Sequence, residues 1–373
     1  MTTSERRTVV VAGASGVVGA AAVRQFAAAG WRVVAVSRRP PDDLAGAQFL
    51  SVDLADAAAC RDALGSIAPS HVVFTALKER PGLVSGWTDR ELMAENLAMF
   101  EHCLDPLLAG DAVEHVSLLQ GTKAYGAHVG IVTPLPCKED APRVEHENFY
   151  FLQEDALRAR AARHGFAFTV WRPQVVFGDS IGSPMNPVPV LGVYGALLRE
   201  RGLPLAYPGG ERHVGEAVDA DLLGRALVWG ADAPTARDEI FNVTNGDVYT
   251  WPDVWPAIAE ALGMEVGEPS PVRLAEAIPA GADEWAAIVA RHGLRAPADV
   301  LAFVGDSPVY ADILMRPFGP VPRAPHPREH GEAAPGRVRR ECRHRRDVRT
   351  HAAPPPGAWL AAAPLTVLPH PTT

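Results

Sequence analysis

The sequence has no apolar run long enough to cross a bilayer, and its first seven residues are polar. These two features argue against a membrane anchor and against a signal peptide. We therefore expect a cytoplasmic protein with no membrane partner. Cysteine is also scarce, and no two cysteines have the spacing typical of metal ligands. We therefore expect no metal site, and we expect reduced, mostly buried thiols at Cys60, Cys103, Cys137 and Cys342.

Basic residues are scarce in most of the chain. Ten of its 35 Lys and Arg but only four of its 44 Asp and Glu lie in residues 316–373, so residues 1–315 carry a net charge of −15. An acidic body of this kind argues against a nucleic-acid partner. Hydrophobic residues make up 47% of the chain and its mean hydropathy is near zero, which predicts a globular core in one large domain or two closely packed ones.

The N-terminal region contains a strand that runs into a glycine-rich turn. Residues 8–12 predict a buried strand, and an alanine-rich helix is expected over residues 17–29. Gly13 permits a tight turn, Gly16 lets the backbone approach a pyrophosphate, and Gly19 lets the helix pack close to the strand. The phosphates of a dinucleotide would then lie at the free N–H groups of the helix. The cofactor contacts expected here are Gly13, Ser15, Gly16, Val17 and Gly19.

Strands and helices alternate along the following part of the chain. Further strands are expected at residues 31–39, 48–54, 71–77, 113–119 and 168–173. Helices are expected at residues 57–67, at 92–108, which carries Asn96, and in a segment that ends near His164. Strands that alternate with helices at this spacing form right-handed crossovers and a parallel sheet. The expected fold class is α/β, a Rossmann doubly wound parallel sheet with a smaller C-terminal substrate-binding portion, and its ligand edge lies at the carboxyl ends of the strands.

The ends of three strands carry polar side chains at this ligand edge. A free ribose 2′-hydroxyl would favour an acidic residue after the second strand, whereas Arg38 and Arg39 suit a 2′-phosphate, so NADPH is the expected cofactor. Asp53 is placed to meet the adenine amino group, and the end of the strand at 71–77 would line the nicotinamide ribose. The predicted contacts at these strand ends are Ser37, Arg38, Arg39, Asp53, Leu54 and Thr75.

Two motifs follow the fifth strand, QGTKAYG at residues 120–126 and ENFYFLQED at residues 147–155. A conventional short-chain reductase carries a Lys four residues, or one helical turn, after its catalytic Tyr. Position 154 is Glu here, and no Tyr in the chain is followed by Lys at that spacing. The common catalytic pair is therefore missing.

These motifs, with several others, resemble the progesterone 5β-reductase and iridoid synthase-like group of extended short-chain dehydrogenases/reductases. The resemblance runs from Val9 to about Met315. Its motifs around Lys123 and Tyr150 are quite specific. The matching pieces are LQGTKAY (119–125), NFY (148–150) with ED (154–155), WRP (171–173) with FG (177–178), MN (185–186), DADL (219–222) and FNVTNGD (241–247).

The resemblance implies that Tyr150 takes the place of the catalytic tyrosine and that Lys123 supplies, from a strand end, the ammonium that other reductases supply from the helix. Reduction of a conjugated enone puts hydride on the β carbon and negative charge on the carbonyl oxygen, so the site needs a donor at that oxygen. A phenol is a suitable donor, and a nearby ammonium would lower its pKa and stabilise the enolate. Phe151 departs from the family, in which several members carry a second Tyr.

The resemblance also implies contacts around the nicotinamide and the substrate. Residues 184–199 would form the lid and wall of the substrate pocket. Additional cofactor contacts are expected at Gln120, Val176 and Ser183, and the expected substrate-pocket residues are Phe151, Met185, Asn186 and Tyr194. For Met185 and Tyr194, an ordinary core position is an equal alternative.

The domain organisation follows from these assignments. Residues 1–175 form the predicted NADP-binding Rossmann domain, and residues 176–315 form a mixed segment that completes the sheet and builds the substrate-binding portion. Residues 316–373 are a Pro- and Arg-rich tail, which we expect to be poorly ordered. We interpret it as frameshifted from about Pro317, because residues 328–349, back-translated with GC-rich codons and read one base later, can encode a segment that resembles the closing helix of the family.

The leading hypothesis is an NADPH-dependent reductase of activated C=C bonds that acts on a small enone or enal. An alternative enzyme of the same fold is a carbonyl reductase or a sugar-nucleotide epimerase or dehydratase, which the missing Tyr and Lys pair disfavours. An NADP-binding regulator without turnover would keep the glycine turn but would not need Tyr150 and Lys123. The sequence leaves open the natural substrate and whether the protein forms a homodimer.

Overall fold

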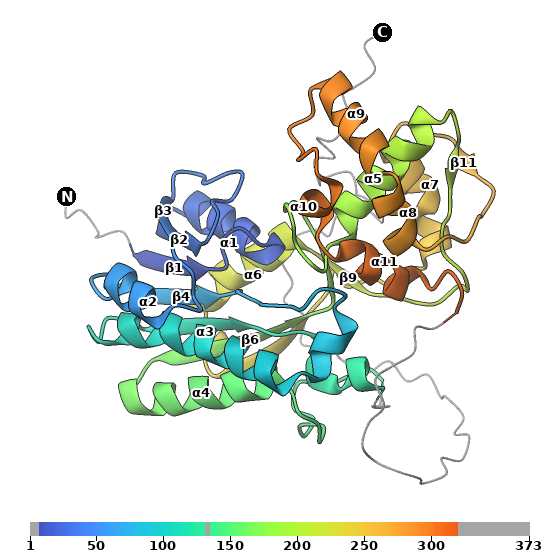
Figure 1. Ribbon diagram of the computed structural model, residues 1–373. Helices are drawn as coiled ribbons and strands as arrows, with labels where there is room; N and C mark the ends of the chain where they lie inside the picture. Colours follow the sequence, from blue (N-terminus) through green and yellow to red (C-terminus); the bar gives the residue numbers. More distant parts are fainter. Residues whose placement is uncertain (1–6, 131–134, 320–373) are drawn as a thin grey trace, which may run out of the picture.

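The computed structural model describes residues 7–130 and 135–319. The larger part of the molecule is a seven-stranded, fully parallel sheet with the strand order β10-β6-β5-β4-β1-β2-β3 (Figure 1). Its strands are β1 (Thr8–Ala12), β2 (Arg32–Ser37), β3 (Gln48–Ser51), β4 (His71–Phe74), β5 (His115–Leu119), β6 (Ala167–Pro173) and β10 (Glu239–Val243). The order reverses direction at β1, which confirms the predicted doubly wound sheet.

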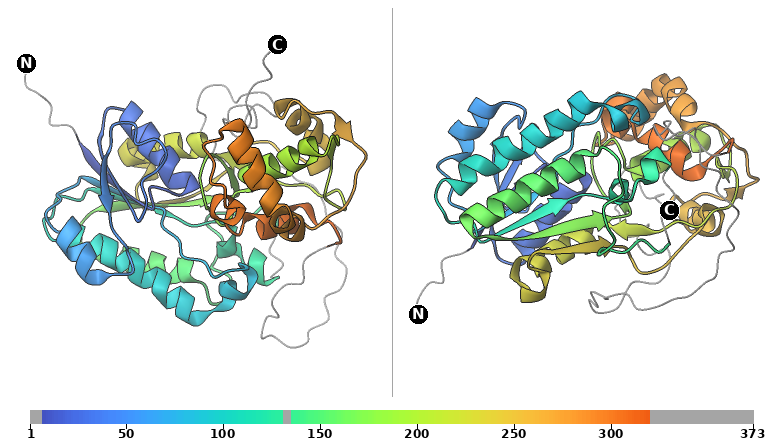
Figure 2. Two further views of the ribbon diagram at one scale, coloured as in Figure 1. Left: turned by 45° about the horizontal axis from the view of Figure 1, so that its top comes forward. Right: turned by 90° about the horizontal axis from the view of Figure 1, so that it is seen from below.

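Helices cover both faces of this sheet. On one face lie α1 (Val17–Ala28) and α6 (Ala220–Asp232), and on the other lie α2 (Ala57–Leu64), α3 (Arg90–Leu108) and α4 (Phe149–His164) (Figures 1 and 2). Side chains alternate along β1, so Val9 and Val11 pack under α1, and Val10 packs in the core of the opposite face. The nearly continuous apolar strands in the sequence are therefore buried on both sides.

A smaller, mostly helical part is packed beside the carboxyl ends of the strands. Its own core includes Trp251, Trp255 and Trp285. Its elements are β7 (Val175–Phe177), α5 (Pro187–Glu200), β8 (Leu205–Ala206), β9 (Ala217–Asp219), α7 (Trp251–Ala261), β11 (Val266–Gly267), α8 (Leu274–Ala280), α9 (Ala282–His292), α10 (Val300–Val304) and α11 (Ser307–Met315). Between them the chain returns to the larger part to add α6 and β10. The domain boundaries at residues 175 and 315 stay predictions.

Some expected element boundaries are wrong. The helix after β3 ends at Leu64 rather than 67, and α3 begins at Arg90 because the Asp89 carboxylate accepts hydrogen bonds from two backbone N–H groups of its first turn. The segment expected as a lid at 184–199 is largely α5, a helix of the smaller core that is buried over most of its length. Its apolar residues belong to that core, because they pack against α8, α9 and α11.

The described residues bear on two further expectations, and a third lies outside them. Cys60 and Cys103 are free and buried, and burial raises the pKa of the Cys60 thiol to about 11. No helix in the described ranges is both long and apolar enough to cross a membrane. Cys342 and the interpretation of residues 320–373 as a frameshifted, poorly ordered tail lie outside the described residues.

Candidate active site

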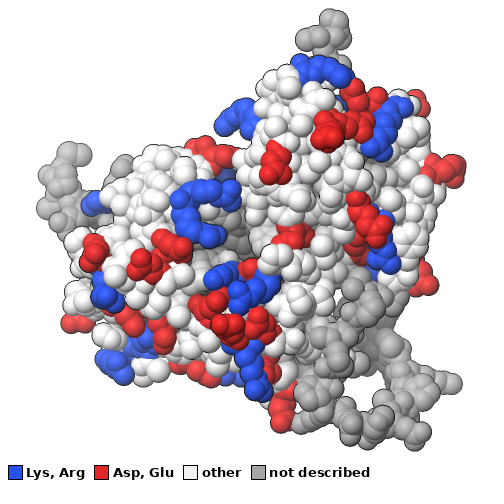
Figure 3. Space-filling model, viewed as in Figure 1, with Lys and Arg blue, Asp and Glu red and all other residues white. Residues whose placement is uncertain are grey.

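A cavity of about 1520 Å³ lies where the carboxyl ends of the strands meet the smaller part. Figure 3 shows a hollow between the two parts, with Lys and Arg side chains at its border. Every residue predicted to contact the dinucleotide lines this cavity: Gly13, Ser15, Gly16, Val17, Gly19, Ser37, Arg38, Arg39, Asp53, Leu54, Thr75, Gln120, Val176 and Ser183. The fold thus collects these positions, which lie far apart in the sequence, around one space. Their contacts with a cofactor stay predictions.

The glycine turn has the shape of a phosphate cradle. Gly13 has a φ of +84°, and a Cβ atom there would lie 2.7 Å from the backbone nitrogen of Ala76. A Cβ atom on Gly19 would lie 2.1 Å from the carbonyl oxygen of Gly13, so only glycine lets the helix approach the turn this closely. Gly16 is the N-cap of α1 and has no side chain to cap the helix N–H groups. These residues fit a pyrophosphate, because the amides of the first helical turn are left for it.

Two hydroxyl groups at neighbouring strand ends donate hydrogen bonds to backbone carbonyls beside the cavity. The Ser37 hydroxyl donates to the carbonyl of Arg39 at 2.6 Å, and the Thr75 hydroxyl donates to the carbonyl of Ala12 at 2.8 Å. The side chains of Arg38 and Arg39 are exposed at the cavity, and neither forms an ion pair with another described residue. The Arg39 guanidinium donates a long hydrogen bond of 3.5 Å to the carbonyl of Ile181, and because no carboxylate among the described residues is paired with either side chain, both guanidinium groups can bind an anion at the end of β2.

Tyr150 lies in the first turn of α4, and its side chain faces the cavity. The Asn148 side chain caps the helix by accepting a hydrogen bond from the Tyr150 N–H at 3.0 Å. The Tyr150 hydroxyl lies 3.3 Å from the position that a Cβ atom on Gly121 would occupy, and it has no hydrogen-bond partner among the described residues. Burial, followed by the charge of Glu79 and the proximity of Tyr310, raises the pKa of Tyr150. The phenol therefore remains protonated well above neutral pH.

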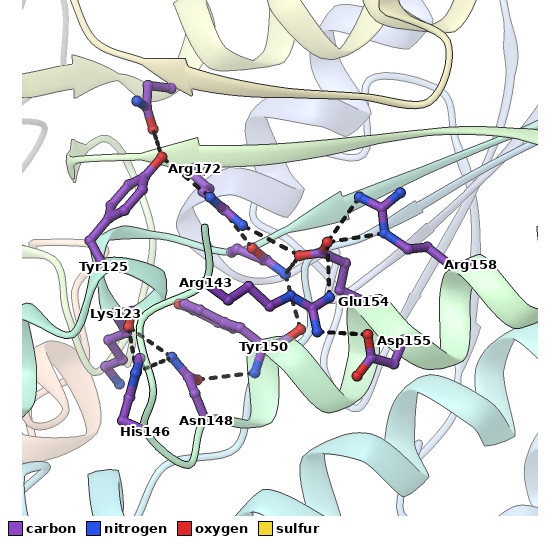
Figure 4. A network of polar contacts seen from close by, with 12 residues as sticks. Lys123, Tyr125, Arg143, His146, Asn148, Tyr150, Glu154, Asp155, Arg158 and Arg172 are labelled. Carbon is purple, nitrogen blue, oxygen red and sulfur yellow. Dashed lines mark hydrogen bonds and ion pairs between the residues drawn. The ribbon is translucent and has the colours of Figure 1, made fainter. Parts of the chain in front are cut away.

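Lys123 lies in the short 3-10 helix η2 (Thr122–Tyr125), just past the end of β5. Its carbonyl oxygen accepts a hydrogen bond from the Asn148 amide at 2.8 Å, which ties η2 to the start of α4 (Figure 4). Its ammonium lies 2.8 Å from a carboxylate oxygen of Glu79 and 4.7 Å from the ring centre of Trp87. Burial lowers the pKa of Lys123, and Glu79 opposes that effect.

The net pKa shift of Tyr150 is opposite in direction to the lowering that we expected from a nearby ammonium. We expected a nearby ammonium to lower the pKa of the phenol, but burial and the Glu79 carboxylate raise it. Burial of the phenol is the largest cause of this shift, and the Lys123 ammonium is itself paired with Glu79. Lys123 and Tyr150 do line the same cavity as the glycine turn.

Glu154 occupies the position one turn after Tyr150, and Figure 4 shows it at the centre of a buried network. Its carboxylate lies within 3.4 Å of the guanidinium groups of Arg143, Arg158 and Arg172, and Gln120 also donates to it. Burial alone would raise the pKa of Glu154, but Arg143 and Arg158 hold it below its usual value. Glu154 therefore fixes α4 to the ends of β5 and β6, and a Lys at this position would face three like charges.

Three of the four predicted substrate-pocket residues lie outside the cavity lining, which contains only Met185 of this set. Phe151 packs its ring against the Arg143 guanidinium. Asn186 is fully buried and caps α5, because its side chain accepts a hydrogen bond from the helix backbone. Tyr194 lies in the core of the smaller part. Each side chain is occupied by its own packing or hydrogen bonds, and we correct these three expectations.

The cavity also contains residues that the sequence did not identify. Trp87, from the 3-10 helix η1 (Val84–Thr88), and His128 line it, and one ring nitrogen of each is buried without a hydrogen-bond partner among the described residues. Tyr310 reaches it from α11. Trp87 lies in the segment after β4, and the end of β4 was expected at the ligand edge. Its position in the sequence could therefore have indicated that it lines the cavity. No sequence signal indicated Tyr310, because only the packing of α11 against α5 and α8 brings it to the cavity.

The sequence is similar to one known protein family and to several known enzymes. Residues 9–244 match the NAD dependent epimerase/dehydratase family. The chain is 32% identical to an (S)-8-oxocitronellyl enol synthase of Antirrhinum majus over 287 residues, which cover 71% of this chain and 70% of that protein. It is also 32% identical to a 3-oxo-Delta(4,5)-steroid 5-beta-reductase of Arabidopsis thaliana over 257 residues, which cover 63% of this chain and 62% of that protein.

Solved structures agree on the fold. A UDP-glucose 4-epimerase of Thermotoga maritima superposes with a TM-score of 0.56 at 19% identity and covers 70% of this chain and 86% of its own. At this identity the likeness concerns the fold alone. The sequence matches show that the chain belongs to the NAD dependent epimerase/dehydratase family and, within it, to the progesterone 5β-reductase and iridoid synthase-like group of extended short-chain dehydrogenases/reductases.

Proposed function

We propose that the protein is an NADPH-dependent reductase that reduces the activated C=C bond of a small enone or enal by 1,4-addition. The proposal depends above all on one observation, the single cavity that Tyr150, Lys123 and the glycine turn line together. The relatives support the choice of reaction, because the name of the steroid 5-beta-reductase describes a conjugated ketone. A cytoplasmic location and a homodimer stay predictions.

The side chains of the cavity account for the chemistry of such a reduction. NADPH supplies the hydride when it is bound. As hydride reaches the β carbon, negative charge develops on the carbonyl oxygen of the substrate, and the hydroxyl of Tyr150, which lines the cavity, would donate a hydrogen bond to it. The positive charge of Lys123, in the 3-10 helix η2, also favours negative charge on the substrate oxygen. The raised pKa of Tyr150 means that the phenol acts as a neutral donor.

The reaction is tested by following NADPH oxidation with three substrates in parallel: a small cyclic enone, the matching saturated ketone and a sugar nucleotide. We expect consumption with the enone; the enolate left by hydride transfer takes a proton from water at its α carbon, which gives the saturated ketone. Consumption with the saturated ketone but not the enone would assign the protein to the carbonyl reductases instead. Because epimerisation consumes no NADPH, conversion of the sugar nucleotide is followed by chromatography, and cofactor binding without conversion of any of the three would favour a regulator.

We propose that Arg38 and Arg39 select NADPH by binding its 2′-phosphate. Charge-assisted hydrogen bonds contribute about 1.5–3 kcal/mol each. The double change Arg38→Ala with Arg39→Ala should therefore raise the Kd for NADPH by at least about 10-fold, since 1.4 kcal/mol is a factor of ten. The Kd for NADH should change little, because NADH lacks that phosphate. Both constants are measured by titrating the quenching of protein fluorescence.

Arg32→Ala is the matched control for this pair. Arg32 is also exposed, but it begins β2 and therefore lies at the opposite edge of the sheet, where it bonds Gln48. Its removal should leave both dissociation constants unchanged. An equal loss of NADPH and NADH affinity in the double variant would contradict the assignment.

A further inference from the structure

The cavity wall contains a buried ion pair that the proposed reaction does not by itself explain. The side chains of Lys123 and Glu79 are 12% and 5% exposed, and the two charged groups are 2.8 Å apart. Lys123 and Trp87 line the cavity, but Glu79 does not. Glu79 therefore contacts the ammonium from within the protein and is not placed to touch a substrate.

The backbone that carries Glu79 is held by a second buried group. Asn96, which is 1% exposed in α3, donates to the carbonyl of Lys78 and accepts a hydrogen bond from its N–H, both at 2.9 Å. Gln153 of α4 in turn donates to the carbonyl of Asn96 at 2.8 Å. A chain of buried hydrogen bonds thus connects the helix of Tyr150 to the residue before Glu79. This network holds the backbone next to Glu79 in place.

The charges around Lys123 make Glu79 important for its protonation. A buried amine tends to lose its proton, and an opposite charge nearby favours the charged form. Among the described residues, Glu79 is the acidic group that contacts this ammonium. The other titratable neighbours are His128, which burial keeps neutral by lowering its pKa to about 3, and His146, whose ring lies 3.1 Å from the Lys123 carbonyl oxygen.

We propose that Glu79 is a positioning residue of this site, which holds the Lys123 ammonium at the cavity wall and keeps it protonated although it is buried. The same carboxylate favours the protonated form of Tyr150, because a negative charge opposes ionisation of the phenol. Loss of Glu79 should therefore make both groups lose their protons at lower pH. The consequence for turnover rests on the proposed function, but the state of Lys123 does not.

The state of Lys123 is measured without substrate, from the rate of its acetylation by acetic anhydride at a series of pH values, read by mass spectrometry. In Glu79→Gln the titration midpoint of Lys123 should fall by about one to three pH units, the usual effect of an opposite charge at this distance. Glu79→Asp keeps the charge but withdraws it by one methylene, and should give a smaller fall. An unchanged midpoint in both variants would overturn the proposal.

Glu95→Gln is the matched control. Glu95 pairs with Lys78 and Arg80 close to the same loop and is not part of the cavity lining. Its replacement should leave the midpoint of Lys123 unchanged. If Glu79→Gln does not fold, as judged by thermal unfolding and NADPH binding, Glu79→Asp decides the question by itself, because it moves the carboxylate away from the Lys123 ammonium: a lower midpoint supports the proposal, and an unchanged midpoint overturns it.

Turnover gives a separate readout. With the enone that the enzyme reduces, the alkaline limb of the kcat/KM profile should move to lower pH in Glu79→Gln. In the background of Lys123→Met, the same change should move that limb less, because the contribution of Lys123 is gone. An identical shift in both backgrounds would show that Glu79 does not act through Lys123. If no enone is reduced, the proposed function fails while the acetylation experiment still decides the role of Glu79.

Discussion

Replacement of Tyr150 by Phe is expected to lower kcat by about 10²- to 10³-fold, the usual effect of removing one donor from an oxyanion site. The ring and its packing remain, and only the hydroxyl is lost. Because that hydroxyl has no hydrogen-bond partner among the described residues, its removal leaves no partner unsatisfied in the protein. The Kd for NADPH should change little, since the hydrogen bond forms chiefly with the charged transition state. Steady-state kinetics and fluorescence titration measure the two quantities.

Tyr207→Phe is the control for this experiment. Tyr207 is also a buried tyrosine whose hydroxyl lacks a partner among the described residues, but it lies outside the cavity lining. It should keep the kcat of the unmodified protein. If Tyr150→Phe likewise kept full activity, the donor to the substrate oxygen would have to be another group, and our assignment of Tyr150 would be wrong.

The change Glu154→Gln is expected to lower the free energy of unfolding by about 3–5 kcal/mol, the typical result of removing one partner from a buried ion pair. Arg172 is 5% exposed and would keep a charge without its carboxylate. Arg143 and Arg158 would lose the same partner. Urea-induced unfolding at neutral pH measures the difference. An effect below about 1 kcal/mol would show that the network is not important for stability.

Asp155→Asn is the control, because Asp155 is the next residue and also pairs with Arg143, but its side chain is 62% exposed. Exposed pairs contribute about 0–1 kcal/mol. Both variants remove one negative charge, so the difference between their unfolding free energies shows the effect of burying that charge.

The pH dependence of the Glu154 effect has a definite sign. Its neighbours lower the pKa of Glu154 in the folded protein, so its stabilising contribution is fully present above the unfolded value of about 4.3. The contribution is lost as pH falls through the folded pKa. The difference in unfolding free energy between the unmodified protein and Glu154→Gln should therefore shrink below about pH 4.3. A difference that stayed constant on acidification would contradict the assignment of that pKa.

The dinucleotide half of the site could be predicted because its signals are local. Gly13, Gly16 and Gly19 lie within seven residues of one another, and the strand ends that carry Arg38 and Asp53 follow from the alternation of apolar strands and helices. In a parallel sheet the carboxyl ends of all strands meet at one edge, so the pattern alone brings these residues together. The cavity lining agrees with every one of these positions.

The substrate half could not be predicted in the same way. Met185, Asn186 and Tyr194 lie in one short segment, but only Met185 faces the cavity. Asn186 ends up as a helix cap, and α5 buries Tyr194 in a core formed with helices that come later in the chain. An apolar segment of this kind is equally compatible with a pocket wall and with a core. The choice depends on which helix packs against which face, and this information is not local.

The sequence by itself determined the doubly wound sheet and the glycine turn, and through its resemblance to the family it predicted Tyr150 and Lys123 as replacements for the missing conventional pair. Only the tertiary structure decided the charge state around them. It placed Glu79 against the Lys123 ammonium and three guanidinium groups around Glu154. The physical reason is that strand and helix patterns are set by neighbours along the chain, whereas the pKa of a buried group depends on its neighbours in space and on its distance from water.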